Sequence, residues 1–165
     1  MNQLLRDPVN VAAIGIGATV VMDLWLFALQ RMNVPTLNFA LIGRWIGHLR
    51  SGRWHHPSIT KAAPIEGELV MGWVFHYAVG IGFAALLVAL QGMSWASKPS
   101  LLPALGLGLA TVVVPLFVMQ PAMGAGVASS KTPTPWRNRL RSAANHTVFG
   151  AGLYLSAAAF AWLAQ

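Results

Sequence analysis

Four long apolar blocks, separated by polar segments, dominate the pattern of the chain. They run from about 9 to 30, 69 to 90, 101 to 119 and 142 to 164. About 20 helical residues cross the roughly 30 Å hydrocarbon core of a membrane. Every backbone amide in lipid must be satisfied, and the ten-residue alternation of barrel strands is missing, so each block is predicted to be a transmembrane helix. The predicted fold is all-α: one transmembrane domain over residues 1–165, built as a four-helix bundle.

A shorter helix is predicted between the first two blocks, from about 37 to 50. Apolar residues recur there at spacings of three and four: Leu41, Ile42, Trp45, Ile46 and Leu49. Other residues take the opposite side: Arg44, Gly47, His48 and Ser51. This pattern is typical of an amphipathic helix that lies at the inner headgroup layer. His55 and His56, with Glu66 and Glu68, follow it in what is expected to be a solvated loop; a cytoplasmic vestibule or a loose metal site are the alternatives.

Composition excludes several classes of protein. Apolar residues make up 56% of the chain and charged residues only 9%, whereas a soluble domain carries about a quarter charged residues. Cys is absent, which excludes disulfides, iron–sulfur clusters and thiolate metal sites. Any metal would need His, carboxylate or backbone oxygen ligands.

The basic residues predict an orientation in the membrane. The formal charge is +7, but the Lys and Arg residues stand between the apolar blocks, where lipid headgroups are the nearer anions, so nucleic-acid binding is not expected. Two connections hold nine of the 11: Arg31, Arg44, Arg50, Arg53, Lys61, Lys131, Arg137, Arg139 and Arg141. Both connections are therefore predicted to face the cytoplasm of a bacterial inner membrane, with both termini outside. The last four of these residues are expected to contact lipid headgroups.

The segment 124–141 invites a second interpretation, as a phosphate-binding loop. It lacks the Gly before Lys131 that such a loop requires, and it follows a membrane helix instead of a strand. Nucleotide binding is therefore not expected. Just before this segment, Pro115 is expected to kink the third block and Pro121 to end it.

The blocks contain an internal similarity. Residues 14–23 resemble 105–115, and residues 76–83 resemble 146–153, where both segments read His-x-x-x-Gly-x-Gly. Two repeated helical hairpins related by an axis along the membrane normal would explain the order of these matches. Glycines let helices approach closely in lipid; another interpretation is that they clear space beside each His for a flat cofactor or a solute. The expected packing residues are Gly72, Gly80, Gly82, Gly150 and Gly152.

Three ionisable residues within the blocks are the candidates for function. Asp23, His76 and His146 each lie roughly 6 to 12 Å inside the cytoplasmic boundary, at about 1.5 Å per residue. Ionisable groups in a membrane are costly, which makes them functional candidates. If their helix faces turn inward, a carboxylate meets two imidazoles. Secondary polar candidates are Thr19, Glu68, Tyr77, Gln120 and Tyr154.

Several activities fit such a cluster. It could carry protons, bind a divalent metal, or supply two axial His ligands to a b-type haem; neither cofactor is required. Alternatively, Asp23 pairs with a His or a backbone carbonyl only to hold helices together. Because no catalytic triad or cofactor motif is present, nothing calls for an enzyme. The expected function is movement of a proton, metal ion or small solute by a homo-oligomer; a haem electron carrier or an accessory membrane subunit are the alternatives.

Three segments resemble a known family. GELVMGWVFHYAVGIGFA, VMQPAMGAGVASSKTPTP and HTVFGAGLY are similar to segments of small bacterial inner-membrane proteins known as domain of unknown function 2938. The resemblance covers nearly the whole chain and implies a four-helix membrane protein without an established activity. The positions that match the family pattern are Glu68, Gly72, Trp73, His76, Tyr77, Gly80, Gln120, Pro121, Gly124, Lys131, His146, Gly150 and Tyr154.

Overall fold

The computed structural model describes residues 3–163, and within this range the chain forms helices and their connections without a strand. This confirms the predicted all-α class. The elements are α1 (Gln3–Arg31), α2 (Phe39–Leu49), η1 (Ile59–Lys61), α3 (Glu68–Gln91), α4 (Met93–Ser97), α5 (Leu101–Ala110), η2 (Pro115–Met119), α6 (Gln120–Ala122), η3 (Val127–Ser129) and α7 (Pro135–Leu163).

Four helical segments of the described chain are long and apolar enough to cross a membrane. They are Pro8–Arg31, Glu68–Gln91, Leu101–Ala122 and Pro135–Leu163. The last begins well before the expected residue 142, and residue 164, its expected end, lies outside the described residues. The 29 residues of α7 span about 43 Å, which exceeds a hydrocarbon core of roughly 30 Å. Its first two turns, which carry Arg137, Arg139 and Arg141, are thus helical, although an inter-helix connection was expected there.

The third apolar segment is not one continuous α-helix. α5 ends at Ala110, and residues 115–119 form the π-helical segment η2. Pro115 has no N–H to donate to the carbonyl of Thr111 four residues earlier, which explains the interruption. The Gln120 N–H donates instead to the Pro115 carbonyl, five residues back. The helix does not end at Pro121, because α6 continues to Ala122.

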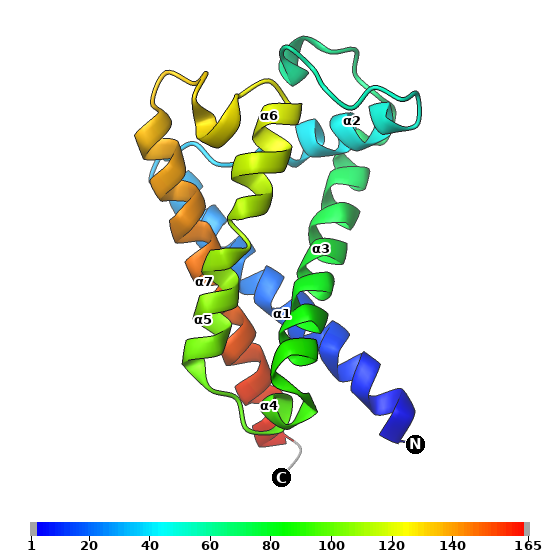
Figure 1. Ribbon diagram of the computed structural model, residues 1–165, viewed down its shortest axis with the longest axis vertical. Helices are drawn as coiled ribbons and strands as arrows, with labels where there is room; N and C mark the ends of the chain where they lie inside the picture. Colours follow the sequence, from blue (N-terminus) through cyan, green and yellow to red (C-terminus); the bar gives the residue numbers. More distant parts are fainter. Residues whose placement is uncertain (1–2, 164–165) are drawn as a thin grey trace. The chain divides into compact units, whose positions relative to one another are not determined.

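The chain divides into two compact units. Within the described residues, unit 1 comprises residues 3–34, 77–111 and 145–163; unit 2 comprises residues 35–76 and 112–144. Unit 1 therefore contains α1, α4, α5 and the later parts of α3 and α7, whose ribbons can be followed in Figure 1. Unit 2 contains α2, η1, η2, α6, η3 and the first parts of α3 and α7.

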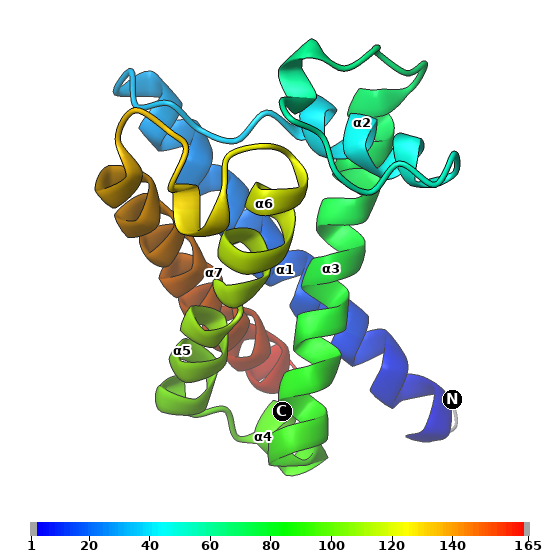
Figure 2. The ribbon, with the colours of Figure 1, turned by 45° about the horizontal axis from the view of Figure 1, so that its top comes forward.

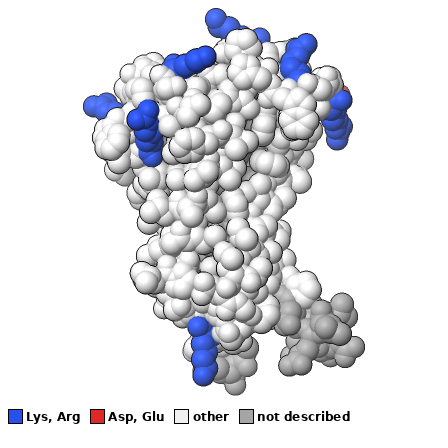
Figure 3. Space-filling model, in the orientation of Figure 1, with Lys and Arg blue, Asp and Glu red and all other residues white. Residues whose placement is uncertain are grey.

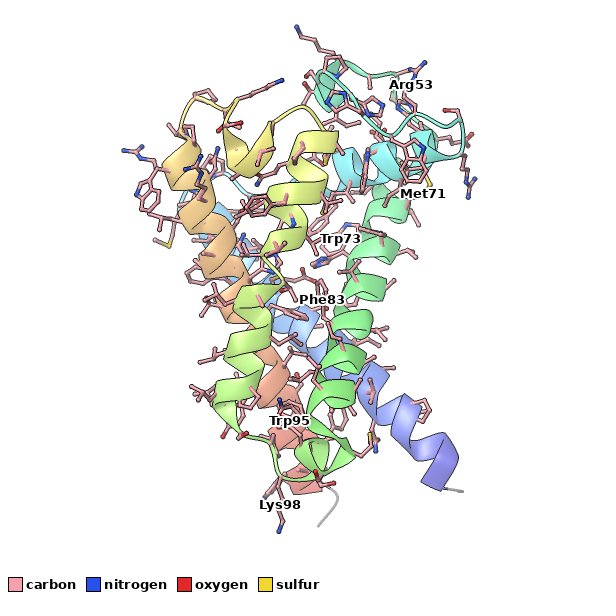
Figure 4. All side chains as sticks on the ribbon, viewed as in Figure 1. Arg53, Met71, Trp73, Phe83, Trp95 and Lys98 are labelled. Carbon is pink, nitrogen blue, oxygen red and sulfur yellow. The ribbon has the colours of Figure 1, made fainter. Side chains whose placement is uncertain are left out.

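Unit 1 has one hydrophobic core to which all its helices contribute. Trp95 of α4 is buried and points into the bundle (Figure 4), while its indole N–H donates to the Ser100 carbonyl at 3.2 Å. Phe83 of α3 meets Phe149 of α7 edge to face, with ring centroids 6.1 Å apart. The buried core residues are Ile14, Ala18, Ala84, Leu87, Val88, Trp95, Ala104, Phe149, Leu153 and Ala157.

Glycines set the close helix contacts of unit 1. A Cβ on Gly80 would collide with the Thr19 hydroxyl of α1. One on Gly150 would lie 2.7 Å from the Ala104 carbonyl oxygen of α5, and one on Gly152 would lie 2.9 Å from the Ala18 carbonyl oxygen of α1. These three glycines therefore occupy helix–helix contacts, where only a hydrogen fits.

The packing role expected of Gly82 is wrong for this chain. A Cβ on Gly82 would meet no described atom within 4 Å. Residues two apart on a helix point to nearly opposite sides, so Gly80 faces α1 while Gly82 faces away. The same alternation separates Gly108, which contacts α7, from Gly106, which is open. Different glycines of the matching Gly-x-Gly motifs therefore make the helix–helix contacts in the two hairpins. The duplication of the hairpins stays a prediction.

In unit 2, α2 packs against the start of α3, as Figure 2 shows. The Asn38 side chain caps α2 by accepting from the Ala40 N–H at 3.0 Å. A Cβ on Gly43 would collide with the Glu68 carbonyl, and one on Gly72 with the Phe39 carbonyl. The two helices are therefore in backbone contact at these glycines. α2 was expected to lie at the headgroup layer, and that placement stays a prediction.

Candidate functional site

Asp23 has a hydrogen-bond partner on a neighbouring apolar helix of unit 1. The Tyr77 hydroxyl of α3 donates to Asp23 Oδ2 of α1 at 2.8 Å, and both residues are partly buried. One turn of α1 earlier, the buried Thr19 hydroxyl donates to the Gly15 carbonyl at 2.8 Å. The pair places an ionisable carboxyl beside a phenol within two candidate membrane spans, where a charge is costly unless it is hydrogen-bonded.

His146 of α7 has its own partner in unit 1. Its Nδ1 lies 2.8 Å from the Thr111 hydroxyl oxygen, which also donates to the Gly108 carbonyl at 2.6 Å. Since the hydroxyl proton goes to Gly108, His146 Nδ1–H is the donor toward Thr111. This contact adjoins the place where α5 ends before Pro115, so the interrupted helix helps to fix the imidazole.

Unit 1 contains a further polar contact that the sequence did not indicate. The Trp25 indole N–H of α1 donates to the Asn145 side-chain oxygen of α7 at 2.9 Å. Asn145 directly precedes His146, and Trp25 lies two residues after Asp23. Polar bonds between helices are thus present next to both ionisable residues, and they fix the helices that carry them.

His76 belongs to unit 2 and is surrounded by aromatic rings there. Its ring centroid lies 4.6 Å from that of Phe39 in α2 and 5.8 Å from that of Trp73, one turn earlier in α3. The convergence of His76 with Asp23 and His146 stays a prediction. Among the side chains of residues 8–163, no three His, Asp or Glu are grouped as a metal ion would require.

Two secondary candidates have structural surroundings. Tyr154 packs against the core of unit 1. In unit 2, the Gln120 side-chain oxygen accepts from the hydroxyl of the buried Ser129 at 2.8 Å. Ser129 and its neighbour Ala128 have positive φ angles of 62° and 48°, which non-glycine residues rarely adopt. The Arg139 side chain donates to the Ala128 carbonyl at 2.7 Å, so this arginine stabilises the turn.

An ion pair joins α2 to α3 in unit 2. Arg44 donates from Nε and Nη2 to the two carboxylate oxygens of Glu68, at 2.8 and 2.7 Å. Arg44 also donates to the carbonyls of Ile59 and Ala62, and Glu68 accepts from the Ile65 N–H. Both side chains are mostly buried, with exposures of 13% and 17%. Glu68, one of the secondary polar candidates predicted from the sequence, thus holds the connecting loop against α3.

Breaking this ion pair is expected to destabilise unit 2. Arg44→Gln or Glu68→Gln leaves one charge half-buried without its partner, so each should lower the thermal unfolding midpoint in detergent by several degrees. The double variant should cost less than the two single losses combined. Arg53→Gln, at an exposed position in the following loop (Figure 4), is the matched control. Equal midpoints for Arg44→Gln and Arg53→Gln would contradict this role of the ion pair.

Two histidines of unit 2 form a buried pair. His48 Nδ1 lies 2.7 Å from His56 Nε2, and only 9% and 3% of these residues are exposed. The expected positions were wrong, since His48 was placed on the polar side of its helix and His56 in a solvated loop. His48 follows Trp45 by three residues, which puts both on the buried face of α2. The three-residue spacing between Trp45 and His48 is the sequence feature that could have predicted the buried position of His48.

Unit 2 carries most of the positive charge. Most of the Lys and Arg side chains visible in Figure 3 gather over its loops. Lys98 of unit 1, in contrast, follows α4 and points away from the bundle (Figure 4). Unit 2 holds eight of the 11 basic residues against two of the four acidic ones. The eight are Arg44, Arg50, Arg53, Lys61, Lys131, Arg137, Arg139 and Arg141.

Comparison with known families identifies the chain. Residues 12–160, most of its length, match the family described as "Protein of unknown function (DUF2938)". The chain belongs to the DUF2938 family. No curated protein and no solved structure matches it, and the description of DUF2938 names no activity. This agrees with the sequence resemblance noted above.

Many positions that carry the resemblance to DUF2938 have a definite contact. In unit 2, Glu68 binds Arg44, Gly72 contacts the Phe39 carbonyl, and Gln120 accepts from Ser129. In unit 1, Tyr77 donates to Asp23 and His146 bonds to Thr111. The DUF2938 pattern therefore includes residues that hold the fold as well as the candidate polar residues of the membrane helices.

Proposed function

We propose that this DUF2938 protein moves protons across a bacterial inner membrane, alone or together with a small solute. The observation that carries the proposal is the Asp23–Tyr77 hydrogen bond of 2.8 Å between α1 and α3. Asp23 is the group that takes up and releases the proton, because ionisable residues within membrane spans mark proton relays and ion pathways. Tyr77 orients it and stabilises the charged form by donating a hydrogen bond.

The neighbouring contacts of unit 1 support this role. His146 is an imidazole held by Thr111 on the same set of helices, and imidazole can donate and accept protons near neutral pH. Asp23 and His146 would thus provide two exchangeable groups. Glycine contacts hold α1, α3, α5 and α7 close together in unit 1, which suits a path for protons better than one for a large solute.

The distribution of charge supports the proposed orientation. The basic loops of unit 2 would face the cytoplasm, with both termini on the other side. Lys131 and the arginines at the start of α7 would then meet anionic headgroups. The homo-oligomeric state expected from the small size of the chain is part of the same proposal.

Reconstitution into liposomes tests the function. Wild-type protein in potassium-loaded liposomes with an internal pH-sensitive dye should acidify the lumen when valinomycin imposes a negative potential inside. Acidification should be faster than in protein-free liposomes and should increase with protein density. Equal rates of acidification at every protein density would contradict proton movement without a co-transported solute. The assay is therefore repeated with amino acids, sugars and divalent cations outside the liposomes. If none of them stimulates acidification, the proposal is rejected.

An absorption spectrum of the same preparation separates this function from electron transfer. A haem held by His76 and His146 would give a Soret band that disappears in the His76→Ala, His146→Ala double variant. A preparation without such a band is expected from proton movement. A stoichiometric haem would replace the proposal.

A further inference from the structure

The His48–His56 pair connects two elements of unit 2. His48 lies in the last turn of α2, and His56 lies in the loop that follows α2. Their rings are stacked, with centroids 4.9 Å apart and an angle of 25° between the planes. The His56 N–H donates to the Ala122 carbonyl at 2.8 Å, and the Ile59 N–H donates to the Met123 carbonyl at 3.0 Å. The pair therefore holds the loop of residues 50–61 between α2 and the end of α6.

The pair is arranged for neutral imidazoles. At 2.7 Å, the two facing nitrogens have room for one proton between them, so one ring donates and the other accepts. The other nitrogen of His56, Nδ1, is buried and has no hydrogen-bond partner among the described residues. An additional proton on His56 would therefore place a charge on a buried ring.

The charged groups around His56 oppose its protonation. Burial lowers the pKa of His56 first, followed by the nearby His48, Arg53 and His55; only the Ala122 carbonyl of α6 acts in the opposite direction. On α3, the carboxylate near His48 is that of Glu68, which is paired with Arg44. In an open loop, His56 would titrate near its ordinary value of about 6.5. Since the open form then binds more protons, acidification favours opening, and alkaline pH favours the closed form.

We propose that the His48–His56 pair is an acid-released latch: when neutral it closes the 50–61 loop against α6, and protonation opens the loop. The latch should be closed above about pH 6.5, and the open population should rise up to about tenfold for each pH unit below that. Opening removes the Ile59 backbone from α6 and with it one carbonyl that Arg44 binds. A lower pH in the solution that contacts unit 2 would thus weaken the connection between α2 and α3.

Hydrogen–deuterium exchange of the full chain in detergent tests the latch. Peptides covering residues 50–62 are compared at about pH 7.5 and about pH 5, after correction for the intrinsic pH dependence of amide exchange. A peptide from α1 in unit 1 is the internal reference. The amides of His56 and Ile59 should lose protection by about tenfold or more at the lower pH, while the reference does not. Equal corrected protection at both values would overturn the proposal.

Matched substitutions identify the titrating group. His56→Gln keeps a hydrogen-bonding side chain but cannot be protonated, so the pH dependence should disappear, whether the loop is closed or open in that variant. His55→Gln changes the exposed neighbour and should retain the wild-type pH dependence. If His56→Gln still loses protection in acid, or if His55→Gln abolishes the effect, the latch is not this pair. The wild-type profile alone decides the matter if a variant fails to fold.

Discussion

Replacing Asp23 by Asn is expected to reduce the proton flux of reconstituted protein by about 100-fold or more, to the rate of protein-free liposomes. Asn has nearly the same size and can accept the hydrogen bond from Tyr77, but it cannot bind and release a proton. The internal dye assay measures this loss at equal protein density. A wild-type rate in Asp23→Asn would exclude the carboxyl as a member of the path.

Tyr77→Phe provides the graded comparison. It removes one hydrogen bond to the carboxylate, which contributes roughly 1.5–3 kcal/mol, so a flux loss of about tenfold is expected. Tyr154→Phe makes the same chemical change on α7, where the ring packs against the core of unit 1. This control should keep nearly full flux. Equal losses for the two variants would show that the effect of Tyr77→Phe comes from packing.

Gly108→Val is expected to destabilise the bundle strongly, whereas Gly106→Val is expected to be tolerated. A Cβ on Gly108 would lie 2.5 Å from the Gly150 Cα and 2.6 Å from the His146 carbonyl oxygen, so α5 and α7 would have to separate. Overpacking of this kind costs about 1–3 kcal/mol or more. A Cβ on Gly106 meets no described atom within 4 Å. Helix propensity changes equally in both variants.

Thermal unfolding in detergent measures the difference. The midpoint of Gly108→Val should fall well below that of the wild type, with poor recovery of folded protein, while Gly106→Val should be close to the wild type. Indistinguishable midpoints would mean that α5 and α7 are not in backbone contact at Gly108.

The membrane helices could be predicted from sequence because lipid imposes a simple requirement. Apolar blocks of about 20 residues must be helical there, and Pro115 marks the interruption of the third helix. The start of α7 at Pro135 was not predicted, because three arginines in its first turns lower the hydropathy without preventing a helix. A hydropathy pattern locates the apolar part of a helix but not the residue at which the helix begins or ends.

Side-chain partners could be predicted less well. Asp23 was recognised as costly in a membrane, but nothing in the spacing of the sequence pairs it with Tyr77, 54 positions away. Arg44 and Glu68 are likewise brought together by the path of a long loop. Gly82 was expected to pack against another helix, and His48 was placed on the polar side of α2; both predictions were wrong. A glycine has no side chain whose polarity could indicate whether its side of the helix is buried. His48 is a polar residue at the boundary of the apolar face of α2, so its polarity did not indicate burial.

Infrared difference spectroscopy of the membrane-reconstituted protein tests most directly whether Asp23 exchanges a proton within its span. Spectra are recorded while the pH is cycled between acidic and alkaline values, for wild type and Asp23→Asn. The proposed function predicts a carboxylic acid C=O band that appears on acidification in the wild type and is missing from the variant. The same carboxyl bands in both proteins would contradict a titrating Asp23 and, with it, the proposed role in proton movement.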